Sequence, residues 1–246
     1  MTHETLPPSR PPCAAAVVFA MAVEADAFAA LAREAVDFEA GGLTIHEGLC
    51  ADRRVAWCVG GAGAAAATRA ARLLIDGHRP GIVVTAGFAG GLDATLTRGA
   101  VVRPTRTISG TGGPPLELVA GRGSGPGLSI VSVDRVVTTA AAKRDLAAAT
   151  GAAVVDMETH AVATAARDAG LPCVGIRVIS DDAAQDLPRE IAAVVQPQSG
   201  MRRLGAALGA IGRRPRAAID MWTLWEHAVV DGRTLAAAIE EFVRGL

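Results

Sequence analysis

Val155-Asp156-Met157-Glu158-Thr159-His160 and Ile176-Arg177-Val178-Ile179-Ser180-Asp181 are the two stretches that decide the fold. Each follows or contains an apolar run that is typical of a buried strand, and each places carboxylates at the end of that strand. About one helix separates them, as in a strand–helix–strand unit. Ligands of open α/β sheets bind at the strand ends. The two stretches therefore predict both a sheet and the position of its binding site.

Outward from these stretches, apolar runs alternate with alanine-rich helical segments. We expect strands at residues 14–19, 43–48, 54–59, 82–86, 100–102, 128–133, 153–155 and 173–179. We expect helices at residues 24–33, 64–75, 140–150 and 158–169. This alternation predicts an α/β fold with three α/β/α layers around a central mixed, mostly parallel sheet.

The two ends of the chain and one internal segment depart from this alternation. Residues 1–12 are polar and proline-rich, and we expect a disordered arm there. We expect residues 13–246 to form a single domain, with residues 187–246 as a helical C-terminal extension. Residues 109–127 are rich in glycine and proline, which favours a loop or flap.

Composition excludes several classes of protein. Half of the 246 residues are hydrophobic, which suits one large core, and the formal net charge is −1. Aromatic residues make up 3% and no basic stripe is present, so the sequence does not favour nucleic-acid binding. The four cysteines, Cys13, Cys50, Cys58 and Cys173, lack metal-ligand spacing, and we expect buried free thiols and no metal site.

The N-terminal residues have no positively charged segment followed by a long apolar one, so they do not form a signal peptide. The apolar run at 14–23 is shorter than the roughly 20 residues that span a bilayer. We therefore expect a cytoplasmic protein with reduced thiols. A basic stretch in the tail, Arg202, Arg203, Arg213, Arg214 and Arg216 with Trp222 and Trp225 behind it, could contact a membrane surface. We favour a helical hairpin that packs on the domain or on a partner subunit.

Four segments, in this order and spacing, resemble the purine nucleoside phosphorylase and nucleosidase superfamily. They are Ala20-Met21 with Glu24, Gly87-Phe88-Ala89-Gly90-Gly91-Leu92 with Arg98-Gly99, Asp156-Met157-Glu158, and Arg177-Val178-Ile179-Ser180-Asp181. The N-terminal part looks more like the methylthioadenosine/adenosylhomocysteine nucleosidases. The C-terminal half, from Ala140 onward, looks more like the hopanoid-associated phosphorylases, which are thought to release adenine from adenosylhopane.

The resemblance implies roles for particular residues. Asp181, steadied by Ser180, would protonate the departing base near N7, a task that needs a raised pKa. Glu158 would accept hydrogen bonds from the ribose hydroxyls, with Met157 against the sugar. The remaining substrate contacts would come from Phe88, Ala89, Gly90 and Val136. Alternatively, Ser180-Asp181 only caps a turn, and Glu158 only complements a helix dipole.

The nucleophile stays open at this point. In the nucleosidases the glutamate that matches Glu24 orients the attacking water, with the arginine that matches Arg177 nearby. Phosphorylases hold phosphate with arginine and with serine or glycine, and Phe88 replaces a serine here, which favours water. Arg177 and the backbone N–H groups of residues 60–63 or 87–91 could still cradle phosphate.

We therefore expect cleavage of the N-glycosidic bond of an adenine nucleoside with a 5′ substituent, which could be lipid-linked as in adenosylhopane. A methylthioadenosine/adenosylhomocysteine nucleosidase is the alternative. A non-catalytic nucleoside-binding protein on the same fold is the second alternative. No cofactor is implied, although phosphate could be a cosubstrate, and by analogy we expect a homo-oligomer.

Overall fold

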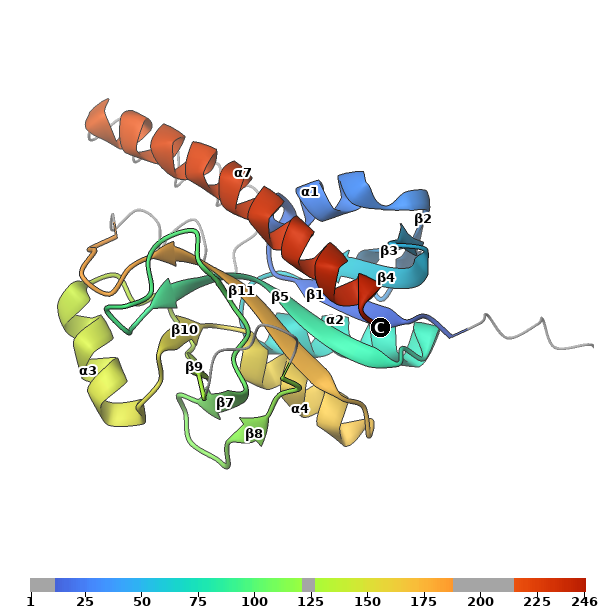
Figure 1. Cartoon of the computed structure of the whole chain (residues 1–246), viewed down its shortest axis with the longest axis horizontal. Helices are drawn as coiled ribbons and strands as arrows, with labels where there is room; N and C mark the ends of the chain where they lie inside the picture. Colours follow the sequence, from blue (N-terminus) through green and yellow to red (C-terminus); the bar gives the residue numbers. More distant parts are fainter. Residues whose placement is uncertain (1–11, 121–126, 188–214) are drawn as a thin grey trace, which may run out of the picture.

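In the computed structural model, a mixed sheet with helices on both faces forms the centre of the protein (Figure 1). The structure describes residues 12–120, 127–187 and 215–246, and in the last segment it describes side chains from residue 226 onward. Its strands in the described residues are β1 (Ala15–Phe19), β2 (Arg33–Ala40), β3 (Leu43–Cys50), β4 (Arg53–Val59), β5 (Ile82–Gly91), β6 (Val101–Val102), β7 (Arg106–Ser109), β8 (Leu116–Glu117), β9 (Ser129–Ser132), β10 (Val154–Asp156) and β11 (Cys173–Asp181). They follow the order β2-β3-β4-β1-β5-β10-β9-β7-β8, while β11 pairs with β5 and β6.

Parallel pairing holds the middle of the sheet. Strand β1 lies parallel to β4 and β5, and β11 lies parallel to β5. Antiparallel pairs extend the sheet at β2–β3, β3–β4 and β7–β8, and β10 runs antiparallel to the end of β5. Because β1, β5 and β11 point the same way, their carboxyl ends meet at one edge of the sheet, where the sequence predicts the site.

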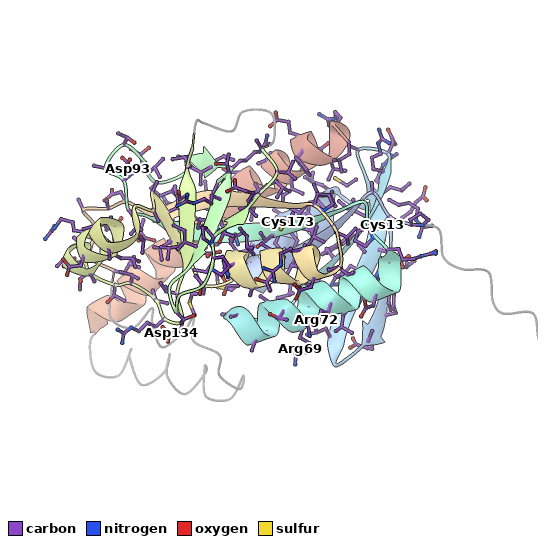
Figure 2. All side chains as sticks on the ribbon, turned by 90° about the horizontal axis from the view of Figure 1, so that it is seen from below. Cys13, Arg69, Arg72, Asp93, Asp134 and Cys173 are labelled. Carbon is purple, nitrogen blue, oxygen red and sulfur yellow. The ribbon has the colours of Figure 1, made fainter. Side chains whose placement is uncertain are left out.

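Helices form the two outer layers. Figure 1 shows α1 (Ala22–Leu31) and α7 (Pro215–Arg244) on one face of the sheet, and α2 (Ala64–His78) and α4 (Thr159–Asp168) on the other. Helices α2 and α4 lie side by side in the foreground of Figure 2. Helix α3 (Ala140–Thr150) packs at the end of the sheet that contains β9 and β10. The predicted three-layer α/β/α architecture is therefore confirmed.

The alternation of side chains along β1 divides the core into two parts. Ala16 and Val18 face the layer of α2 and α4, whereas Val17 and Phe19 face α1 and α7. Phe28 of α1 is fully buried in the second part, and its aromatic ring lies 5.8 Å from that of Phe19. Burial of such a side chain stabilises the fold by about 1.5–3 kcal/mol. A strand that is apolar on both faces therefore marks the centre of the sheet.

Local signals set some boundaries accurately. Helix α3 spans the predicted residues 140–150, because the Thr139 hydroxyl accepts a hydrogen bond from the Ala142 N–H at its start. Gly151, at φ 66°, ends the helix in the left-handed region. Strand β5 continues to Gly91, beyond the predicted end at residue 86, because its glycines pair with β10 and β11.

Three strands lie where the sequence predicted none, namely β2, β7 and β8, the last of them inside the predicted loop at residues 109–127. The prediction extended the first helix to Arg33 and placed no strand at residues 33–40, whereas β2 occupies them. Strand β2 is an edge strand whose side chains are mostly exposed, so it lacks the buried apolar positions on which the prediction relied.

Several predictions concern the cysteines and the tail. All four cysteines are buried and free, as predicted, and burial raises the pKa of Cys58 to about 12.

Helix α7 agrees with a helical C-terminal tail. Residues 188–214 and the side chains of Trp222 and Trp225 lie outside the described residues. Residues 1–11 and 121–126 lie outside them as well. Among the helices that the structure describes, none is both long and apolar enough to cross a membrane.

Candidate active site

A small cavity lies where the carboxyl ends of β1, β5 and β11 meet. Its lining includes Glu24 from the first turn of α1, Arg177 from β11 and Glu158 from the turn before α4, together with Gly87 and Phe88 from β5. The fold thus gathers four of the residues that the sequence singles out, from four separate segments of the chain. The cavity combines two carboxylates and one guanidinium with a strand end that carries no charge.

Glu24 is fixed in place by backbone donors. One carboxylate oxygen, Oε2, accepts hydrogen bonds from the N–H groups of Ala20 at 3.0 Å and Met21 at 2.9 Å, and Oε1 accepts one from Phe88 at 2.9 Å. Burial raises the pKa of the Glu24 carboxyl, while these donors act in the opposite direction. The side chain is therefore both immobilised and basic, the properties that a general base requires.

The glycine at position 87 is required by this arrangement. A Cβ atom on Gly87 would lie 2.7 Å from Glu24 Oε1, closer than real Cβ contacts allow. The next glycine, Gly90, is nearly as confined, since a Cβ atom there would lie 3.2 Å from Oδ2 of Asp181. The glycine-rich end of β5 therefore passes between the carboxylates of Glu24 and Asp181, and its lack of side chains permits both close approaches.

Arg177, which lines the cavity, is held by a buried acidic residue, Asp156. Its Nη2 lies 2.7 Å from Asp156 Oδ2 and donates to the hydroxyl oxygens of Thr85 and Thr159 at 2.7 Å each. Ser132 Oγ donates to the other oxygen of Asp156, at 2.6 Å. Both charged side chains are almost completely buried, and the pair is therefore a fully hydrogen-bonded network.

Glu158 connects the turn before α4 to the glycine turn before α2. Its Oε1 accepts a 2.6 Å hydrogen bond from the N–H of Gly63, which has φ 93°. Desolvation and, next, the negative charge of Asp156 raise the pKa of Glu158 to about 7. A carboxylate of this kind changes its charge near neutral pH, so any contact that it makes with a ligand depends on pH.

Asp181 lies at the end of β11, beyond a break in the strand register between Ile179 and Asp181. Such an irregularity redirects side chains at a strand end. Ser180 Oγ donates to Asp181 Oδ1 at 2.6 Å, as the steadying role predicts. The other oxygen, Oδ2, lies 2.5 Å from Nζ of Lys143, a residue of α3. The structure therefore places a buried cation in direct contact with Asp181, which the sequence did not indicate.

The other predicted substrate contacts are not part of the lining of the cavity. Met157 is buried between Asp156 and Glu158, and Ala89 and Gly90 lie on β5 next to Asp181. Val136 lies in the segment that joins β9 to α3. Contacts of these four residues with a substrate remain predictions.

Sequence reasoning did not assign roles to three residues that the structure ties to the site: Asp156, Thr159 and Lys143. Asp156 carried a signal, because a carboxylate that ends a buried strand needs a partner. Lys143 carried none, since lysine in an alanine-rich helix is usually exposed.

The fold and the strand-end cluster of carboxylates with an arginine define an α/β enzyme domain. A family model of the phosphorylase superfamily matches residues 14–128 and 126–207. The chain therefore belongs to this superfamily of nucleoside phosphorylases and nucleosidases and is an enzyme of that class.

Solved structures of low sequence identity share the fold. A mutant Helicobacter pylori 5′-methylthioadenosine/S-adenosylhomocysteine nucleosidase with 5′-methylthioadenosine in its active site has a TM-score of 0.72 at 17% identity, over 95% of this chain and 99% of that one. The Neisseria meningitidis nucleosidase with methylthio-immucillin-A has a TM-score of 0.71 at 21% identity, over 94% and 99%. The futalosine hydrolase of Helicobacter pylori has a TM-score of 0.66 at 17% identity, over 92% and 97%.

Proposed function

We propose that the protein hydrolyses the N-glycosidic bond of an adenine nucleoside with a 5′ substituent and releases adenine. One observation carries the choice of water over phosphate. The backbone groups that would hold phosphate already bind carboxylates. The N–H of Phe88 donates a hydrogen bond to Glu24, and the N–H of Gly63 donates one to Glu158. Arg177 is engaged by Asp156, so an anion in the cavity would face two carboxylates without a free cation among the lining residues.

The proposal assigns each charged group a task. Glu24 takes a proton from the attacking water, whose oxygen bonds to the anomeric carbon as the bond to the base breaks. Glu158 accepts hydrogen bonds from the ribose hydroxyls, which strengthen as positive charge develops on the sugar. Asp181 passes a proton to N7 of the departing adenine. Arg177 and Asp156 fix the floor of the cavity.

Adenine release from 5′-methylthioadenosine and from adenosine, with and without phosphate, tests this proposal. Release that does not depend on phosphate, with oxygen from ¹⁸O-labelled water at the anomeric position of the sugar, is the expected result. Release only with phosphate would overturn hydrolysis and leave cleavage intact. Tight binding of both nucleosides without any release would favour the non-catalytic alternative.

The 5′ substituent stays a prediction from resemblance. The nucleosidase-like N-terminal part favours methylthio or homocysteinyl groups, and the C-terminal half favours a lipid-linked nucleoside such as adenosylhopane. Competition between 5′-methylthioadenosine and adenosylhopane in one assay ranks them directly. Peripheral membrane contact through the tail, a homo-oligomer and residence in the cytoplasm are likewise still predictions.

A further inference from the structure

A lysine is completely buried beside the proposed acid. The side chain of Lys143 has 0% exposure, although its neighbours on α3, Arg144 and Asp145, are exposed. A buried ammonium is costly unless charged or polar partners surround it. The partners of Lys143 therefore indicate why the chain tolerates it there.

Three oxygen atoms surround the Lys143 ammonium. Its Nζ lies 2.5 Å from Oδ2 of Asp181, and it donates hydrogen bonds to the backbone carbonyl oxygens of Asp182 at 2.5 Å and Gln185 at 3.0 Å. The contact with Asp181 is an ion pair between two buried, opposite charges. Ser180 donates a hydrogen bond to Oδ1 of Asp181, so each of the two carboxylate oxygens has its own partner, Ser180 for Oδ1 and Lys143 for Oδ2.

The same contacts join α3 to the segment that follows β11. The N–H of Ala140 donates to Oδ1 of Asp186 at 2.7 Å, and the N–H of Leu187 donates to the carbonyl of Thr138 at 2.8 Å. Lys143 lies one turn into α3 from this junction. The position of Lys143 is therefore set by both elements, and Asp181 contacts it from the end of β11.

We propose that Lys143 is a positioning residue that holds the Asp181 carboxylate and stores the proton that Asp181 passes to the leaving base; this rests on the proposed function. During cleavage, an N–H bond of Lys143 breaks as an O–H bond forms on Asp181. The Asp181 proton moves to N7 as the electron pair of the glycosidic bond moves onto the purine. The water proton taken by Glu24 then returns through solvent to Lys143, so protons balance over one turnover.

Other charged groups near this pair are already engaged or exposed. The segment after β11 contributes Asp182 and Asp186, whose carboxylates accept the N–H groups of Ala184 and Ala140. Helix α3 contributes the exposed Arg144 and Asp145, and β5 contains no titratable side chain. Strand β10 contributes Asp156, which is paired with Arg177. Lys143 is therefore the cation in direct contact with Asp181 among the described residues.

The pH dependence of kcat/KM for adenine release tests the proposal. In Lys143→Met the proton must reside on the carboxylate alone, so the alkaline limb of the profile should move to lower pH by about 1–3 units. Lys143→Arg keeps the charge and should retain most of the wild-type limb. Arg144→Met removes an exposed cation from the next position and should leave the profile unchanged. A Lys143→Met profile that coincides with the wild type would overturn the proposal, as would equal shifts in the methionine and arginine variants.

A measurement on the unaltered protein covers the case in which Lys143→Met does not fold. Carboxyl ¹³C NMR, with the Asp181 signal assigned from its loss in Asp181→Asn, should show an ionised carboxylate in the free enzyme at the pH of maximal turnover. A protonated Asp181 under those conditions would overturn the stored-proton role. Absence of adenine release by the wild type would instead count against the proposed function, and the NMR result would still stand.

Discussion

At the scale of single residues, the site places each carboxylate in a different environment. Glu24 accepts three backbone N–H groups, Glu158 accepts Gly63 and lies near Asp156, and Asp181 contacts Lys143. Under the proposed function, carboxylates serve as base, clamp and acid, and different partners distinguish their environments. The sequence predicts roles for Glu24, Glu158 and Asp181, and these roles stay predictions. It could not supply their contacts with Phe88, Gly63 and Lys143, because those residues come from distant segments.

Glu24→Gln tests the water-activating role. The substitution keeps the size of the side chain and removes its basicity, so we expect adenine release to fall by about 10²–10⁴-fold. Asp26→Asn removes an exposed carboxylate two residues further along α1 and should leave the rate unchanged. Initial rates on 5′-methylthioadenosine would measure both. Near wild-type release by Glu24→Gln would remove Glu24 from the mechanism.

Glu158→Gln tests the ribose clamp through pH. The pKa of Glu158 is raised to about 7, and the clamp requires the ionised form, so wild-type kcat/KM should rise as pH increases through about 7. Glu24 must also be ionised, so the wild-type acidic limb should be steeper than that of a single titration. Glu158→Gln removes one of the two ionising carboxyl groups, so the acidic limb of the pH profile should become shallower. The variant should also lose more in kcat than in affinity for the nucleoside. Limbs of equal steepness in both proteins would contradict the clamp.

At the scale of elements, the end of β5 determines how close the site groups approach. The sequence-based prediction ends the strand at residue 86, before the glycine-rich run, because glycine carries no apolar periodicity. In the structure the run is a strand, paired with β10 and β11. Helix α3 was predictable because Thr139 and Gly151 are local signals, whereas β2 is an edge strand without them. Prediction therefore succeeded where neighbours in sequence decide the structure.

Gly87→Ala tests this role of β5. Gly87 does not have a positive φ, so alanine would not strain the backbone, and the expected effect comes only from the added Cβ near Glu24. Displacement of Glu24 should reduce adenine release roughly 10²-fold. Gly77→Ala in α2 has no atom within 4 Å of the added Cβ and should stabilise the fold by about 0.5–1 kcal/mol without loss of rate. Equal rates for the two variants would exclude the steric argument.

At the scale of the whole molecule, the fold supports a cluster of buried charges that opposes its stability. The Glu158 carboxyl has a pKa of about 7, compared with an ordinary value of 4.5, so the folded protein retains a proton that the unfolded chain releases as pH rises between these values. Stability should therefore fall with increasing pH across this window and level off above it. The two core layers around β1 supply the burial that offsets this loss.

Glu158→Gln should consequently be more stable than the wild type at pH 8, even though it turns over more slowly. Because Glu158 is partly exposed and solvent screens its charge, we expect a gain of roughly 1–2 kcal/mol at pH 8 and none at pH 4. Urea unfolding at both pH values measures the difference, and Asp26→Asn serves as the exposed-carboxylate control. A gain of equal size at both pH values would mean that packing or hydrogen bonding, and not charge, separates the two proteins. A gain confined to high pH would show that the Glu158 carboxylate lowers stability at the pH where the proposed ribose clamp needs it ionised.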